Sequence, residues 1–129
     1  MTAPRVRTTR GQCAQARGIA AETLAAEALE RDGWEILARR LRTRAGEIDL
    51  LAQKSGLLAV VEVKSRRRLS EAASSVSLRQ RTRLIAAADQ ILAEHPDWGA
   101  EGTRFDILVV DAANRVRRIA DAFREGMLE

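Results

Sequence analysis

The sequence predicts a single α/β domain in which a mixed β-sheet is flanked by helices. A chain of 129 residues is long enough for one compact core and too short for two. Its apolar residues follow helical spacing in two segments and strand-like runs in five. In chain order these elements read α-β-β-β-α-β-β, an alternation that favours an α/β fold. We expect residues 1–11 to form a flexible basic arm and residues 12–129 to form the domain.

The first helix is expected from about Gln12 to Arg31. The apolar residues that recur there at helical spacing are Ala20, Leu24, Ala25, Ala28 and Leu29. Gly33 is expected to end the helix, because glycine readily adopts the left-handed conformation found after helix ends. The segment WEILARRLR (34–42) follows and predicts a short strand with a basic outer face.

The next two strands are expected to form an antiparallel hairpin. EIDLLAQ (47–53) and LLAVVEVK (57–64) are both strongly apolar and surround Lys54-Ser55-Gly56. We place the connection at the four residues 54–57. The register that follows pairs Gln53 with Leu58, Leu51 with Val60, and Asp49 with Glu62.

The second half of the chain predicts one helix and two strands. Residues 77–94 form an amphipathic pattern whose apolar members are Leu84, Ile85, Ala88, Ile91 and Leu92. His95-Pro96 is expected to end this helix, because the residue before a proline is disfavoured in the helical conformation. RFDILVVD (104–111) predicts a strand, residues 112–115 a turn, and VRRIA (116–120) an edge strand.

The composition excludes several classes of protein. No apolar run approaches the roughly 20 residues needed to cross a bilayer. The N-terminal segment is basic and lacks the apolar core of a signal peptide, so we expect a cytoplasmic protein. Cys13 is the only cysteine and His95 the only histidine, which excludes an internal disulfide and a zinc site of the Cys/His kind.

The charged residues are dominated by arginine. The formal net charge is +4, and the 22 basic residues comprise 20 Arg and 2 Lys. A basic balance favours an acidic partner such as nucleic acid, although a genomic preference for arginine codons explains the same composition. Lys64 departs from this preference. Lysine is a compact point charge that can approach a water molecule or a phosphate oxygen, so a position that keeps it can have a chemical reason.

Three charged residues of the hairpin form a candidate catalytic site. Strand alternation places Glu62 and Lys64 on the same face, and the predicted register places Asp49 opposite Glu62. Facing residues have Cβ atoms only about 5 Å apart, so the two carboxylates repel each other unless a cation lies between them. Mg²⁺ is suited to this position, because hard cations bind carboxylate oxygens. The spacing Asp-x₁₂-Glu-x-Lys therefore predicts a metal-assisted hydrolytic site.

The same residues carry a resemblance to a known family. GEIDLLAQKSGLLAVVEVKSR resembles the bipartite motif of the restriction-endonuclease-like (PD-(D/E)XK) nuclease superfamily. From about Arg17 to the RFDILVV strand, the chain resembles the YraN-like family of small bacterial proteins, which is assigned to that superfamily. This resemblance implies a restriction-endonuclease-like core with a mixed sheet flanked by helices.

The resemblance also implies roles for single residues. Asp49 and Glu62 are expected to ligate Mg²⁺ or Mn²⁺, together with the backbone carbonyl of Val63. Lys64 is expected to position the attacking water. Glu22 matches an additional glutamate that resolvase-like members contribute to the same metal. The chain departs from the family pattern in having Ala21 for glycine, Arg40 for asparagine and Gln80 for lysine.

The expected substrate is DNA. The candidate nucleic-acid-binding residues flank the metal site in sequence and are Arg42, Arg44, Arg66, Arg67, Arg68 and Arg79. With four aromatic residues and no tyrosine, a platform for stacking single-stranded bases is not expected. We therefore expect a metal-dependent endonuclease that hydrolyses phosphodiester bonds in duplex or branched DNA, with a homodimer left open.

Other interpretations of these residues remain open. Asp49, Glu62 and Lys64 could form a cross-strand charge cluster on a solvated sheet face. The protein could be a non-catalytic nucleic-acid-binding module that keeps the nuclease fold, or a small scaffold that buries an apolar helix face in a partner. Asp106 lies in an apolar strand, where pairing with a nearby arginine explains it as well as catalysis does.

Overall fold

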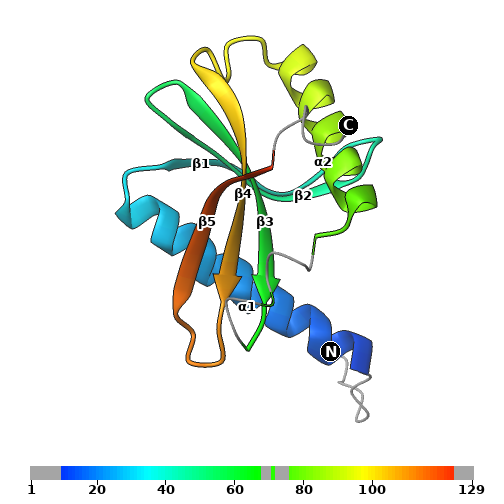
Figure 1. Cartoon of the computed structure of the whole chain (residues 1–129), viewed down its shortest axis with the longest axis vertical. Helices are drawn as coiled ribbons and strands as arrows, with labels where there is room; N and C mark the ends of the chain where they lie inside the picture. Colours follow the sequence, from blue (N-terminus) through cyan, green and yellow to red (C-terminus); the bar gives the residue numbers. More distant parts are fainter. Residues whose placement is uncertain (1–9, 68–70, 72–75, 124–129) are drawn as a thin grey trace, which may run out of the picture.

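The computed structural model describes residues 10–67, 71 and 76–123, and it confirms the predicted order of elements. The elements are α1 (Arg10–Arg31), β1 (Glu35–Arg42), β2 (Glu47–Lys54), β3 (Leu57–Ser65), α2 (Leu78–Glu94), β4 (Gly102–Val110) and β5 (Val116–Phe123) (Figure 1). Two boundaries differ from the prediction. The first helix already begins inside the expected basic arm, whose residues 1–9 lie outside the described part, and β5 is longer than expected.

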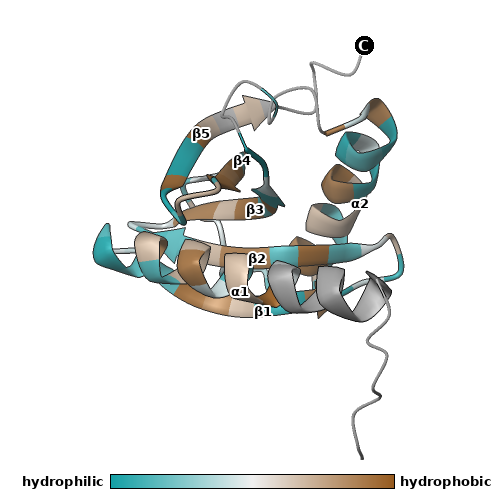
Figure 2. Cartoon of the chain, turned by 90° about the horizontal axis from the view of Figure 1, so that it is seen from below, coloured by the Kyte–Doolittle hydropathy of each residue, from teal (hydrophilic) through white to brown (hydrophobic). Residues whose placement is uncertain are grey.

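The five strands form one mixed sheet in the order β1-β2-β3-β4-β5. Only β3 and β4 are parallel, and the crossover between them carries α2. Alternate residues of β3 contact different helices: Leu58 and Val60 belong to the cluster under α2, whereas Ala59 and Val61 belong to the cluster under α1. The two helices therefore cover opposite faces of the sheet, and Figure 2 shows them on opposite sides of β2.

The helix α1 packs closely on the sheet through small side chains. From Gly18 onward, where the burial of its side chains is described, the buried residues are Ala21, Ala25, Ala26 and Leu29. The expected stop is confirmed, since Gly33 has a φ of +91° and the Trp34 N–H donates to the Leu29 carbonyl over 3.0 Å. This hydrogen bond closes a Schellman motif, in which a left-handed glycine satisfies the last carbonyls of the helix.

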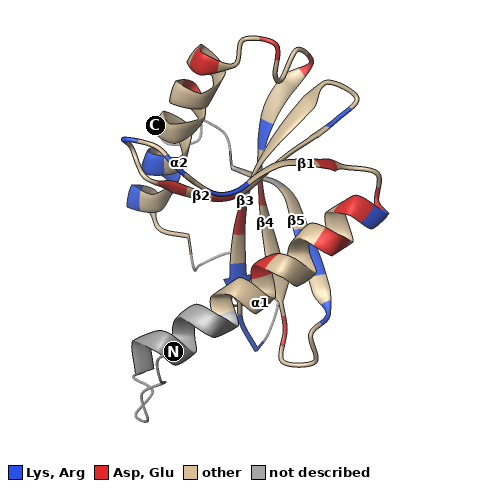
Figure 3. Ribbon diagram, turned by 180° about the vertical axis from the view of Figure 1, so that it is seen from behind, with Lys and Arg blue, Asp and Glu red and all other residues tan. Residues whose placement is uncertain are grey.

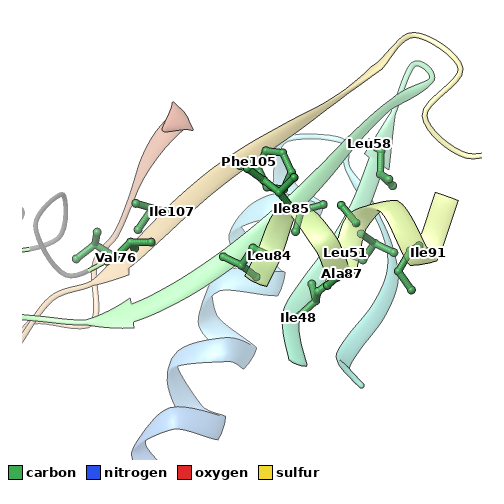
Figure 4. Packing of buried hydrophobic residues seen from close by; sticks show 13 residues of the cluster. Ile48, Leu51, Leu58, Val76, Leu84, Ile85, Ala87, Ile91, Phe105 and Ile107 are labelled. Atoms are coloured by element: carbon green, nitrogen blue, oxygen red, sulfur yellow. The ribbon is translucent and has the colours of Figure 1, made fainter. Parts of the chain in front are cut away.

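The helix α2 begins at a capping box. The Ser77 hydroxyl accepts from the Gln80 N–H, and the Gln80 side-chain oxygen accepts from the Ser77 N–H. Gln80 therefore caps the helix at the position where the family resemblance implies a lysine. The apolar face of α2 packs on β2, β3 and β4 (Figure 4), and its buried residues are Leu84, Ile85, Ala87, Ala88 and Ile91.

The β2–β3 hairpin has the predicted register but a tighter turn. Leu51 faces Val60, as expected. The ladder extends as far as the pair of Lys54 and Leu57, so the connection consists of Ser55 and Gly56 alone. Both residues have positive φ values, +51° and +81°. This is the combination that a type I′ turn requires, and such turns match the twist of hairpin strands. The predicted four-residue connection was wrong, because Lys54 and Leu57 form the last pair of the ladder.

Regular strand structure is interrupted around Asp49. The β2–β3 ladder ends at the pair of Leu50 and Val61, one step before Asp49 would face Glu62. In the β1–β2 ladder the pairs on either side are formed, but the pair of Arg40 and Asp49 is absent, and Arg40 has a φ of +51°. The side chain of Asp49 is therefore held by an irregular piece of sheet between two regular ones.

Neither α1 nor α2, over the residues that the structure describes, combines the length and apolar character needed to span a membrane.

Candidate active site

Asp49 joins the two strands at the point where their backbone ladder ends. Its carboxylate Oδ2 accepts a hydrogen bond from the Val63 N–H over 2.9 Å. The pKa of Asp49 is raised to about 7, mainly by burial and also by the negative charges of Glu62 and Glu22. The hydrogen bond from Val63 lowers the pKa but does not offset these effects. Asp49 and Glu62 thus meet as predicted, with side chains close enough to repel. The predicted direct strand pairing is replaced by a side-chain hydrogen bond to the backbone.

Glu62 and Lys64 form an ion pair on the face of the sheet that α2 covers. The Lys64 Nζ lies 3.1 Å from Glu62 Oε2, and each side chain is only 13% exposed. The predicted alternation is confirmed, and these two charges do compensate each other. The pair is not a solvated surface pair, because its exposure is low and a third charged group, Asp49, adjoins it. Asp49, Glu62 and Lys64 are therefore brought together.

Glu22 approaches the same acidic group from α1. Burial raises the pKa of Glu22, opposed by the positive charge of Arg40 and reinforced by the charges of Glu47 and Glu62. Arg40 Nε lies 3.6 Å from Glu22 Oε1, with Glu22 14% exposed and Arg40 40% exposed. An arginine thus already lies at the glutamate that was predicted to be a metal ligand, and that role of Glu22 stays a prediction.

A cavity of about 300 Å³ lies over the carboxylates of β2 and β3. It is lined by Gly46, Glu47, Asp49, Glu62, Gln80, Arg83 and Leu84. A larger groove of about 620 Å³ runs between the β1–β2 turn and the C-terminal end of α2, but none of the predicted catalytic residues lines it. We take the smaller cavity as the candidate site, because it is where the titratable groups converge.

The donor set suits one hard divalent cation. Within the described residues, no group of three or more Asp, Glu, His or Cys side chains lies in an arrangement that could hold a metal ion. Mg²⁺, however, is usually held by one or two carboxylates and keeps several waters. Asp49 and Glu62 meet that requirement. Burial, and after it the negative charge of Glu62, raises the pKa of Asp49, so a cation would stabilise its ionised form. The residues therefore fit Mg²⁺ or Mn²⁺ through two carboxylates.

The predicted nucleic-acid-binding arginines have different surroundings. Arg42 lies 3.6 Å from Glu47, and Arg66 donates to the Ser65 carbonyl. Arg42, Arg44, Arg67 and Arg79 are exposed, whereas residue 68 lies outside the described part. Figure 3 shows basic residues in the first turns of α2 and in the β1–β2 turn at the same end of the molecule. Four of the predicted arginines are therefore exposed and could contact a phosphate backbone.

Asp106 lies in a buried ion cluster on β4. Arg104 contacts its carboxylate through two hydrogen bonds of 3.1 and 2.9 Å, and Arg118 contacts it from β5 over 2.9 Å. The two guanidinium groups lie 5.2 and 4.9 Å from the centre of the Trp34 ring. Of the two interpretations left open for Asp106, the structure shows the pairing with arginine, and two arginines take part. The second arginine and the tryptophan were not anticipated, since they come from distant parts of the chain.

Comparison with known proteins identifies the family. The family model described as "Uncharacterised protein family UPF0102" matches residues 21–110. The chain belongs to the UPF0102 family. A UPF0102 protein of Granulibacter bethesdensis is 64% identical over 89% of this chain and 73% of its own length. UPF0102 proteins of Azorhizobium caulinodans and of Rhodopseudomonas palustris are 50% and 45% identical, over 88% and 82% of this chain and 87% and 82% of their own lengths. The UPF0102 match spans every residue that lines the candidate site.

Proposed function

We propose that this member of the UPF0102 family is a metal-dependent endonuclease that hydrolyses phosphodiester bonds in duplex or branched DNA. The observation that carries the proposal is the meeting of the Asp49 and Glu62 carboxylates in a cavity between the sheet and α2. The Lys64 ammonium group is paired with Glu62 beside this cavity. The resemblance of the GEIDL and VEVKSR segments to a restriction-endonuclease-like core supports the same function.

The side chains of the site have distinct roles in this proposal. Asp49, Glu62 and the Val63 carbonyl would hold Mg²⁺ or Mn²⁺. When bound, the ion supplies a water of lowered pKa and compensates charge on the phosphate oxygens. Lys64 keeps its ammonium group beside Glu62, where it can orient the attacking water and donate to a phosphate oxygen. The low exposure of Lys64 strengthens such a hydrogen bond, because little water competes for it.

The expected substrate contact is with the phosphate backbone. The exposed arginines of the β1–β2 turn and the start of α2 can bind phosphates without reading sequence. Affinity is then expected to fall steeply with salt, because each neutralised phosphate releases counterions.

The test is cleavage of plasmid and of branched DNA in Mg²⁺ or Mn²⁺. We expect cleavage by the wild type, none in EDTA, and a loss of about 10²-fold in Glu62→Gln, which keeps the size of the side chain but loses a metal-binding charge. Equal cleavage by both proteins would show a contaminating nuclease. Absence of both cleavage and Mn²⁺ binding in the wild type would contradict the proposal.

Arg40 is expected to weaken metal binding, because its guanidinium group pairs with the Glu22 carboxylate and competes with a metal ion for it. Replacing it in Arg40→Asn removes one positive charge from the acidic group, and asparagine tolerates the positive φ at this position. We expect the Mn²⁺ dissociation constant to fall about threefold to tenfold, measured by titration calorimetry. The matched control is Arg117→Asn, which removes an exposed arginine from β5 at the opposite edge of the sheet. Unchanged or weaker Mn²⁺ binding in Arg40→Asn would show that Arg40 does not compete for Glu22.

A second function is favoured by the ion pairs themselves. Glu62 is paired with Lys64 and Glu22 with Arg40, so two of the acids are already compensated inside the protein. A non-catalytic nucleic-acid-binding module would keep this arrangement without a metal. It predicts salt-sensitive DNA binding that is the same in Mg²⁺ and in EDTA and unaffected by Asp49→Ala. The cleavage assay and this binding assay together separate the two functions.

A further inference from the structure

Arg83 lies at the candidate site, where its side chain occupies the space that a Cβ atom at Gly46 would need. Both residues line the cavity that contains Asp49 and Glu62. A Cβ atom at Gly46 would lie only 2.7 Å from Cδ and 2.8 Å from Cγ of Arg83. The aliphatic part of the arginine therefore rests directly on the glycine backbone. Gly46 also has a φ of +150°, so any other residue here would be strained as well as obstructed.

The guanidinium group of Arg83 has no acidic partner in the part of the chain that the structure describes. Within the described residues, no carboxylate lies within ion-pair distance of Arg83, although three carboxylates line the same cavity. Each of those acids has another partner. Glu47 contacts Arg42, Glu62 contacts Lys64, and Asp49 accepts from the Val63 N–H.

The chemistry of this group fits a phosphate. A guanidinium offers a planar set of N–H donors that matches two phosphate oxygens at once. A phosphodiester brought to Asp49 and Glu62 would otherwise meet mainly negative charge in the cavity lining. Arg83 is the only cationic residue among the residues that line this cavity.

We propose that Arg83 binds a non-bridging oxygen of the substrate phosphodiester at this cavity, and that Gly46 is required to seat it. The proposal deepens the endonuclease function and rests on it for the identity of the substrate. The phosphate contact itself does not require hydrolysis. It assigns a substrate-binding role to α2, beyond the carboxylates and the lysine of the hairpin.

A double-mutant cycle tests the contact. Binding of a fluorescent DNA duplex is measured by anisotropy in Ca²⁺ and in EDTA for the wild type, Arg83→Ala, Gly46→Ala and the double variant. We expect Arg83→Ala to weaken binding about tenfold and to reduce the salt slope by about one. Gly46→Ala should weaken binding in the same direction, and the double variant should bind no worse than Arg83→Ala, because both changes remove one contact.

Control variants separate this contact from general charge and from folding. Arg31→Ala removes another exposed arginine, from the last turn of α1, and is expected to bind DNA nearly as the wild type does. Arg83→Lys keeps the charge and is expected to recover part of the affinity. Thermal melting of each variant shows whether Gly46→Ala folds. If it does not fold, the comparison of DNA affinity between Arg83→Ala and Arg83→Lys tests the phosphate contact.

The outcomes distinguish this inference from the proposed function. If Arg83→Ala binds the duplex as tightly as Arg31→Ala does, the inference is overturned even where the wild type cleaves DNA. Additive losses from Gly46→Ala and Arg83→Ala overturn the seating role of Gly46. A specific loss of binding in Arg83→Ala, with no cleavage by any variant in Mg²⁺, supports the phosphate contact and contradicts the endonuclease.

Discussion

Asp49→Ala is expected to reduce metal-dependent DNA cleavage by about 10³-fold or more and to abolish measurable Mn²⁺ binding. Asp49 is one of the two carboxylates that meet at the site, and its hydrogen bond to Val63 also fixes the backbone beside Glu62 and Lys64. The measurement is single-turnover cleavage together with calorimetric titration of Mn²⁺. Retained Mn²⁺ affinity in the variant would place the metal, if one binds, away from Asp49.

Asp49→Asn provides the matched variant and a test that does not depend on activity. The pKa of Asp49 is raised from 3.8 to about 7, so the folded protein binds a proton that the unfolded chain has already lost. The free energy of unfolding of the wild type should therefore fall as pH rises from about 4 to about 7 and level off above that. Asparagine carries no such charge. We expect Asp49→Asn to be about 1–3 kcal/mol more stable than the wild type at pH 8 and to lose this advantage near pH 4.

Urea unfolding at a series of pH values gives the comparison. The difference in the free energy of unfolding between the two proteins should grow as pH rises from 4 to 7, measured in EDTA without substrate. Parallel stability profiles would show that the Asp49 carboxylate is not penalised by its surroundings, and the physical reason for a cation at this site would be lost.

The sequence predicted the elements well because each depends on neighbours in the chain. The helix α2 follows from apolar residues three and four positions apart, together with His95-Pro96 as a stop. The predicted register of the hairpin was correct although the predicted length of its turn was wrong. A shorter turn within a continuous ladder leaves the facing pairs unchanged, so Leu51 still lies opposite Val60.

The site was predicted only as far as it lies on that hairpin. Glu62 and Lys64 share a face by strand alternation, and Asp49 follows from the register. The ion pair of Arg40 with Glu22 could not be predicted. It depends on the positive φ of Arg40 within β1 and on the packing of α1 against the sheet, and neither follows from local sequence patterns. The contact of Arg83 with Gly46 likewise joins α2 to a turn far away in sequence. The glycine directly before β2 was nevertheless a signal that another group approaches the backbone closely there.

Asp106→Ala is expected to lower the free energy of unfolding by about 3–5 kcal/mol, the largest effect on stability that we expect from a single residue. Asp106 is 1% exposed and holds the guanidinium groups of Arg104 and Arg118 together over Trp34. Removing the carboxylate leaves two partly buried positive charges side by side without a counter-ion. Urea unfolding at pH 7 measures the loss.

The charge explanation for this loss can be separated from the loss of side-chain packing. Asp106→Asn keeps the size and hydrogen-bonding oxygen but not the charge, so most of the destabilisation should persist in it. Adding Arg118→Met to Asp106→Ala removes one of the two unpaired charges and should recover part of the stability, although each change alone is destabilising. Simple additivity of the two would show that repulsion between the arginines is negligible and that Trp34 alone keeps both guanidinium groups in place.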